Sequence, residues 1–146
     1  MRRRTGVAQK SGVATGTSAK TLIQLLAVQA IELSELIVGF HGIDNTAEPI
    51  KVELVRQTDA GTMTSLTPGK NDDSVGDALA TTAQHTATVE PTTTDVVRVY
   101  TVHPQTSLVV MFPEDTRPVI GSGDRIGLRV TAAADVNADA ALVFNE

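Results

Sequence analysis

Three histidines are the first candidates for chemistry, because histidine binds metals and transfers protons near neutral pH. His41, His85 and His103 lie far apart in the sequence, and no HxH or HExxH pair is present. Metal sites commonly draw on ligands at such short spacings. His41 precedes Gly42 and His103 precedes Pro104, each at the end of an expected strand. We therefore interpret His41 and His103 as hydrogen-bonded turn residues rather than as ligands or catalysts.

Two polar segments are candidates for ion binding. Asp72, Asp73 and Asp77 bring three acids together, but they lack the spacing of an EF-hand, which also requires a glutamate at its twelfth position. The GSGD segment at 121–124 has the glycines of a phosphate-binding loop, but neither the Walker lysine nor a following helix. We predict a solvated loop at the first segment and a turn at the second.

Neighbouring carboxylates are candidates for a catalytic pair. Glu32 and Glu35 form one such pair, and Glu114 and Asp115 form another. Glycosidases, however, take their two carboxylates from distant parts of a cleft that carries aromatic subsites. This chain has no tryptophan and only one tyrosine, and no serine lies in a GxSxG motif. We predict that the protein is not an enzyme and binds neither a cofactor nor a metal.

Composition indicates one globular domain, since the chain has 146 residues, of which 41% are hydrophobic and 20% charged. The absence of cysteine excludes disulfides, cysteine-based zinc sites and thiol catalysis. Abundant threonine and valine favour strands over helices. No apolar run approaches the roughly 18–20 residues of a membrane span. The basic start lacks the apolar middle of a signal peptide, so we predict neither membrane insertion nor export by that route.

Charge is concentrated at the start of the chain. Residues 1–19 are rich in Gly, Ser, Thr and Ala and hold few large apolar side chains, which predicts a flexible arm. Five basic residues and no acid lie in the first 20 positions, namely Arg2, Arg3, Arg4, Lys10 and Lys20. The rest of the chain has seven basic residues against 17 acidic ones. A basic arm on an acidic body suggests docking on an acidic protein surface or on nucleic acid, and of the two we expect protein. The alternative is a disordered start that is basic by chance.

Alternating apolar residues predict a β-hairpin over residues 35–58. Leu36, Val38 and Phe40 share one face of the first strand, and the same alternation continues in the second strand through residues 50–54. The intervening GIDNTAEP segment contains the residues that close turns. We expect eight residues to be buried in the core: Leu36, Val38, Phe40, Ile50, Val52, Leu54, Leu128 and Phe144.

The remaining segments also indicate strands. Residues 21–33 fit either a short helix or a strand, a turn and the next strand, and we favour the strand. A loop of about thirty residues is expected at about 59–90. Further strands are expected at 93–104, in a core strand at 107–113, after the GSGD turn, and at the C-terminus. With about eight strands, residues 20–146 are predicted to form one all-β domain, a jelly-roll-like antiparallel β-sandwich.

The order of motifs resembles a family of small jelly-roll structural proteins encoded beside the capsid genes of tailed bacteriophages. The likeness covers most of residues 20–146 and rests on these motifs: Lys20-Thr21-Leu22, IVGFHG from Ile37, EPIKVELVRQTDAGTMTSLTP from Glu48, VEPT from Val89, VHPQ from Val102, GSGDRIGLRVTA and the terminal VFNE. The resemblance implies a decoration or cement protein on the capsid exterior, docked on the major capsid protein. It also implies a homo-oligomer, commonly a trimer, and it supplies no catalytic residues.

Two other functions remain open at this point. One is a glycan-binding or host-surface-binding β-sandwich module on the virion or a cell surface, for which exposed aromatic residues would be expected; Tyr100 and three phenylalanines are present. The other is a cupin-like enzyme, which the missing histidine cluster disfavours. Copurification with intact particles, at a fixed ratio to the major capsid protein, would distinguish the virion role from both.

Overall fold

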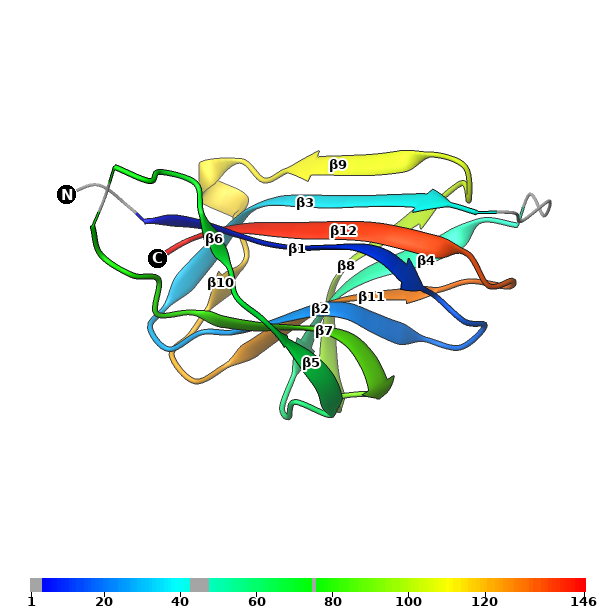
Figure 1. Cartoon of the computed structure of the whole chain (residues 1–146), viewed down its shortest axis with the longest axis horizontal. Coiled ribbons are helices and arrows are strands. Elements are labelled where there is room, and N and C mark those ends of the chain that lie inside the picture. The colour runs from blue at the N-terminus through cyan, green and yellow to red at the C-terminus, as the bar shows by residue number, and fades with distance from the viewer. Residues whose placement is uncertain (1–3, 43–47, 75) are drawn as a thin grey trace.

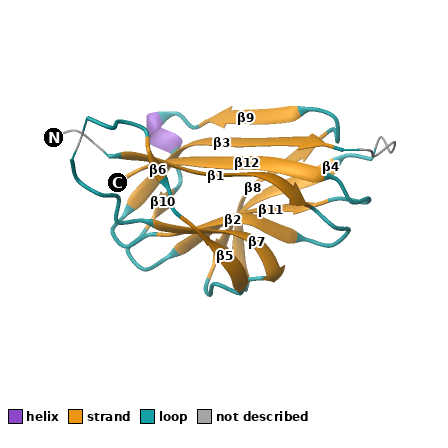
Figure 2. Cartoon of the chain, in the orientation of Figure 1, coloured by secondary structure: helices purple, strands orange, loops and turns teal. Residues whose placement is uncertain are grey.

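All strand pairings are antiparallel, and they form two sheets that pack face to face (Figure 1). The computed structural model describes residues 4–42, 48–74 and 76–146. In these residues, sheet A contains β1 (Thr5–Ala14), β3 (Ile31–His41), β6 (Gly69–Lys70), β9 (Ser107–Met111), β10 (Val119–Ile120) and β12 (Asn137–Asn145). Sheet B contains β2 (Lys20–Leu26), β4 (Ile50–Gln57), β5 (Thr62–Leu66), β7 (Thr82–Val89), β8 (Thr93–Val102) and β11 (Arg125–Thr131). The helical content of the described residues is one 3₁₀ turn, η1 (Glu114–Thr116) (Figure 2).

Eight of these strands pair in a nested order. β1 pairs with β12, β2 with β11, β3 with β9, and β4 with β8. The neighbours in sheet A are therefore β9, β3, β12 and β1, and those in sheet B are β8, β4, β11 and β2. Such nesting arises when a long antiparallel ribbon is rolled into two sheets, which is the jelly roll. The predicted all-β, jelly-roll-like sandwich is confirmed.

The core lies between the sheets, where the alternating faces of both meet. All eight residues predicted to be buried belong to it, and the most accessible of them, Phe40, is 6% exposed. Phe144 of β12 is fully buried, and its ring occupies the space that a Cβ on Gly6 of β1 would need. Glycine at position 6 therefore allows the first and last strands to pack around a large side chain.

The hairpin predicted for residues 35–58 is wrong in its pairing. Both strands exist with the expected inner faces, but β3 belongs to sheet A and β4 to sheet B. β3 pairs with β12, β9 and β10, whereas β4 pairs with β11 and β8. Alternation is a local signal that identifies a strand and its buried face but not its neighbour. Most of the predicted turn, residues 43–47, lies outside the described residues.

The flexible arm predicted for residues 1–19 is also wrong over most of its length. Residues 5–14 form β1, which lies between β12 and β6. Ala8 and Val13 of this strand are buried in the core. The segment looked too poor in large apolar groups to be ordered, yet Gly6 fits closely against the ring of Phe144. Residues 1–3 lie outside the described part of the chain.

The loop predicted at about 59–90 contains strands of its own. We call residues 58–92, which connect β4 to β8, the insertion. β7 pairs with β2 and so extends sheet B, and β5 pairs with the other side of β7. The short β6 pairs with β1 at the edge of sheet A. The insertion thus covers the edge of both sheets on one side of the sandwich, which protects strands that would otherwise be open to pairing. On the opposite side, β9 pairs with β3 alone among the described strands and is therefore an edge strand. A core strand was predicted here, but Val109 and Met111 are exposed.

Candidate functional site

The three histidines lie in separate places, and each side chain is within hydrogen-bond distance of a polar group of the chain. The backbone N–H of Gln105 donates to His103 Nδ1 at 3.1 Å, which confirms the predicted turn. His85 Nδ1 lies 2.9 Å from the Thr86 hydroxyl oxygen, and burial, followed by the nearby Lys10, lowers the pKa of His85. Within the described residues, no group of three or more His, Cys, Asp or Glu side chains is placed to hold a metal ion.

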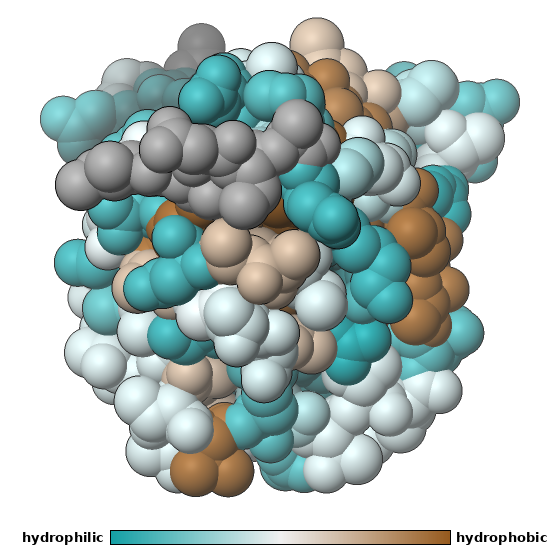
Figure 3. Space-filling view, turned by 90° about the vertical axis from the view of Figure 1, so that its right-hand side faces the viewer, coloured by the Kyte–Doolittle hydropathy of each residue, from teal (hydrophilic) through white to brown (hydrophobic). Residues whose placement is uncertain are grey.

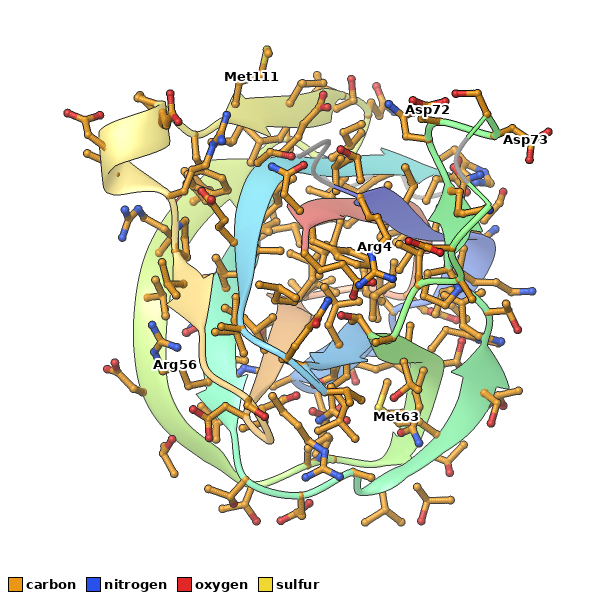
Figure 4. All side chains as sticks on the ribbon, turned by 90° about the vertical axis from the view of Figure 1, so that its left-hand side faces the viewer. Arg4, Arg56, Met63, Asp72, Asp73 and Met111 are labelled. Carbon is orange, nitrogen blue, oxygen red and sulfur yellow. The ribbon has the colours of Figure 1, made fainter. Side chains whose placement is uncertain are left out.

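Local hydrogen bonds are present in both polar segments, at 72–74 and at 121–124. The Ser74 backbone N–H and hydroxyl both donate to Asp72 Oδ1, at 3.0 Å and 2.5 Å. Figure 4 shows Asp72 and Asp73 at the periphery of the molecule, with their side chains directed outward. The GSGD segment is the predicted turn: the Asp124 N–H donates to the Gly121 carbonyl at 3.0 Å.

The basic residues predicted to bind a partner do not form one free cluster. Arg4 donates to the Ala78 carbonyl at 2.7 Å and lies 3.6 Å from Glu146, so its guanidinium is engaged within the chain (Figure 4). Lys20 Nζ donates to the Ala14 carbonyl at 2.9 Å. Lys10 is exposed on β1, and Arg2 and Arg3 lie outside the described residues. The expectation that Arg4 is available for docking is therefore corrected.

A buried carboxylate explains the position of Arg4. The side chain of Glu146 is fully buried and accepts three hydrogen bonds, from the Ala80 N–H at 2.8 Å, the Thr81 N–H at 3.0 Å and the Thr81 hydroxyl at 2.8 Å. These contacts join the C-terminal residue to the insertion, and Arg4 adds the first strand. Sequence patterns did not reveal this site, because its partners are 65 or more residues apart.

A second polar network closes part of the outer face of sheet B. Gln24 donates to Gln57 Oε1 at 2.8 Å and to the Asp59 carbonyl at 2.9 Å. Gln57 in turn donates to the Thr21 hydroxyl at 2.9 Å, and Thr21 donates through its N–H and its hydroxyl to the Glu90 carboxylate. Asp59 and Glu90 belong to the insertion, and Thr21, Gln24 and Gln57 are buried. The insertion therefore covers this part of the sheet.

The outer face of sheet A is open and apolar. Register places Ile37 of β3 between Val109 of β9 and Ala141 of β12, and it places Met111 beside Glu35. Val109 is 57% exposed and Met111 76%. We call the four apolar residues, with Glu35 and Asp139, the sheet A patch. A shallow groove of about 610 Å³ lies beside the exposed Val109 and Met111. Of the patch residues, Ile37, Ala141 and Asp139 line it, and the rest of its lining includes Gly39, Ser107 and Lys10.

The two carboxylates of the sheet A patch outnumber the one lysine, Lys10, that lines the adjoining groove. The Ser11 hydroxyl donates to Asp139 Oδ1 at 2.7 Å, the Gly12 N–H donates at 2.8 Å, and His41 Nε2 lies 3.2 Å away. The Ser11 hydrogen bond makes the largest contribution, and together these contacts lower the pKa of Asp139, so its carboxylate is charged at neutral pH. Ser11 is bonded to the aspartate and not to the histidine, so the three side chains do not form the relay of a serine hydrolase.

A second exposed apolar area lies on the free edge of sheet B. Val96 and Val99 of β8 are 41% and 56% exposed. Register places Val99 beside Glu53 of β4, Glu53 beside Arg129 of β11, and Lys51 beside Thr101 in the next row. Glu53 lies 3.1 Å from Arg129 and 3.7 Å from Lys51, so one buried acid faces two basic residues. We call Val96, Val99, Thr101, Lys51 and Arg129 the β8 patch; with Glu53 counted, its net charge is positive.

Comparison of the chain with protein-family models, with curated proteins and with solved structures found no match. No helix in the described part of the chain is long and apolar enough to cross a membrane. The two patches are therefore the features from which a function is best argued.

Proposed function

We propose that the protein is a structural component of a bacteriophage virion. It decorates the capsid exterior, docks on the major capsid protein and stabilises the shell as a homo-oligomer, with a trimer expected. The resemblance of its motifs to phage decoration proteins supports this role, and so does the jelly-roll fold, which is frequent among viral capsid proteins.

The observation that carries the proposal is the position of the exposed apolar side chains. Five of the seven large hydrophobic residues exposed in the described chain lie on β8, β9 and β10: Val96, Val99, Val109, Met111 and Val119. These strands form the side of the sandwich that the insertion does not cover. Free strand edges that carry apolar side chains invite association, and exposed apolar surface of this kind marks interaction sites. A protein that works in contact with its own copies and with a shell explains why such edges persist.

The test is the composition of the virion. Mass spectrometry and densitometry of purified particles should find the protein at a fixed stoichiometric ratio to the major capsid protein. Particles that lack it should regain it on addition of the purified protein, and should then release their DNA at a higher temperature. Purified particles without the protein, from a lysate in which it is abundant, would refute the proposal.

The N-terminal arginines remain part of the proposed docking surface. Arg2 and Arg3 can form bidentate contacts with carboxylates of the shell, and such contacts weaken with salt where they stay exposed. Deletion of residues 2–19 is unsuitable as a test, because it removes β1. We expect the double variant Arg2→Gln, Arg3→Gln to bind particles more weakly than the wild type and with a smaller dependence on salt. Equal binding at all salt concentrations would show that these arginines do not dock.

A glycan-binding role is the second candidate. The groove on sheet A favours it, since Gln9, Ser11, Ser107 and Asp139 line the groove and offer hydrogen bonds to hydroxyl groups. Chemical-shift changes on addition of an oligosaccharide, confined to these residues, would support this role. No aromatic residue lines the groove, so the stacking surface that sugar sites usually provide is missing there.

A further inference from the structure

We infer that the sheet A patch of one copy packs against the β8 patch of the next copy, so that identical protomers join head to tail in a closed ring. This inference rests on the homo-oligomer of the proposed function and identifies the surfaces that form it. The occupant of the apolar face of sheet A is thus a second copy of this chain.

The apolar parts of the two patches match. Val109 and Met111 project from the outer face of sheet A, and Val96 and Val99 project from the outer face of sheet B next to its free edge. Each of these four residues is more than 40% exposed in the single chain. Packing one pair against the other would remove apolar surface from water on both protomers, which is the main favourable term in association.

The charges of the patches favour contact between unlike patches. The sheet A patch carries the Glu35 and Asp139 carboxylates. The β8 patch presents Lys51 and Arg129, and the single carboxylate of Glu53 between them offsets one of their two positive charges. Two sheet A patches in contact would bring carboxylates of both copies into one interface, and like charges across an interface oppose association. A head-to-tail contact brings opposite charges together instead. The charge pattern therefore selects against a symmetric dimer through the sheet A patch.

The directions of the patches favour a ring. In Figure 4, β8 (yellow-green) curves up one flank of the sandwich, while Met111 projects from β9 at the top. Figure 3 likewise shows brown surface at the top of the molecule and, separately, down its right-hand flank. Met111 and the strand β8 thus lie on neighbouring sides of the molecule rather than on opposite ones. Head-to-tail contacts through opposite sides would stack copies into an open filament, whereas contacts through neighbouring sides turn each copy relative to the last and allow closure.

The test uses two variants that each destroy one patch. Met111→Asp should disable the sheet A patch and Val99→Asp the β8 patch. Each should weaken the contact more than about tenfold, because a strongly hydrated carboxylate would replace an apolar side chain in the interface. Both side chains are exposed in the single chain, so folding should be preserved, and circular dichroism and melting would verify this. Val28→Asp is the matched control, since Val28 is 53% exposed and belongs to neither patch.

Masses in solution, measured by analytical ultracentrifugation, give the outcome. Wild type and Val28→Asp should form the same ring, and each patch variant alone should be monomeric. An equimolar mixture of Met111→Asp and Val99→Asp should form a one-to-one dimer, because each supplies the patch that the other lacks. A monomeric wild type, a patch variant that keeps the wild-type mass, or a mixture that stays monomeric would overturn the inference.

The result is distinguishable from that of the virion test. A ring that depends on both patches but is missing from purified particles refutes the proposed function and leaves the inference standing. A protein that is present on particles as a monomer refutes the inference and the homo-oligomer, but it leaves the role of a virion component standing.

Discussion

Replacing Gly127 by alanine should destabilise the protein through one buried amide. Gly127 lies in the middle of β11, and a Cβ built there would overlap the side-chain oxygen of Gln57. Gln57 is 4% exposed and is held by Gln24 and Thr21. If the new methyl group displaces this amide, two buried hydrogen bonds are lost. Each buried polar group left without a partner costs about 1–3 kcal/mol, so we expect a loss of about 2–6 kcal/mol in the free energy of unfolding.

Urea denaturation followed by circular dichroism, at one fixed protein concentration, measures this loss. Gly69→Ala is the matched control, because its Cβ would meet only the Val7 carbonyl at 4.0 Å, and its effect should stay within about 0.5 kcal/mol. In a Gln57→Ala background, Gly127→Ala should cost far less, since the obstructing amide is absent. A Gly127→Ala protein as stable as wild type, or an equal cost in both backgrounds, would refute the reasoning.

Three further predictions concern the core and the carboxylates. Phe40→Ala should lower the free energy of unfolding by about 3–5 kcal/mol, because a large core side chain is removed, and unchanged melting would contradict its burial. Glu146→Gln should weaken the attachment of the insertion, so limited proteolysis should cut within residues 67–81 faster than in wild type. Equal cleavage rates would show that the Glu146 carboxylate does not hold the insertion in place. Asp139 has a lowered pKa, chiefly through the Ser11 hydroxyl, so its contribution to stability is present above the unfolded pKa of about 3.9 and is lost as pH falls through the folded value. Asp139→Asn should therefore lose less stability than wild type on acidification over that range, and parallel acid unfolding curves would contradict this.

Sequence patterns predicted the buried faces well, because alternation is a local property of a strand. Phe40 and Leu54 could be assigned to the core from their immediate neighbours alone. The pairing of β3 with β12 could not, since the two strands are separated by most of the chain. β9 was misassigned for a related reason: in a run where residues 108–112 are all apolar, no polar residue marks the outer face. The sheet A patch was missed with it.

The remaining misjudgement concerns small residues and distant charges. The small residues of β1 suggested a segment with too little to bury, but the ring of Phe144, from the opposite end of the chain, fills the space that Gly6 leaves. Arg4 looked like a free cation because its partner Glu146 is the last residue of the sequence. Both judgements depend on contacts between the two ends, which no local window of sequence contains.

The nested pairing of the strands has a consequence for the speed of folding. Pairing β1 with β12 directly would close a loop of nearly the whole chain, and sheets rich in such distant contacts fold slowly. If β4 and β8 pair first, however, each further pair closes only the short connections left open by the previous one, so the entropy lost at each step is small. We therefore expect substitutions in the β4–β8 pair to slow refolding, and those in the β1–β12 pair mainly to accelerate unfolding. Stopped-flow folding and unfolding rates for Leu54→Ala in β4 and Leu142→Ala in β12 would show whether the β4–β8 pair forms before the β1–β12 pair.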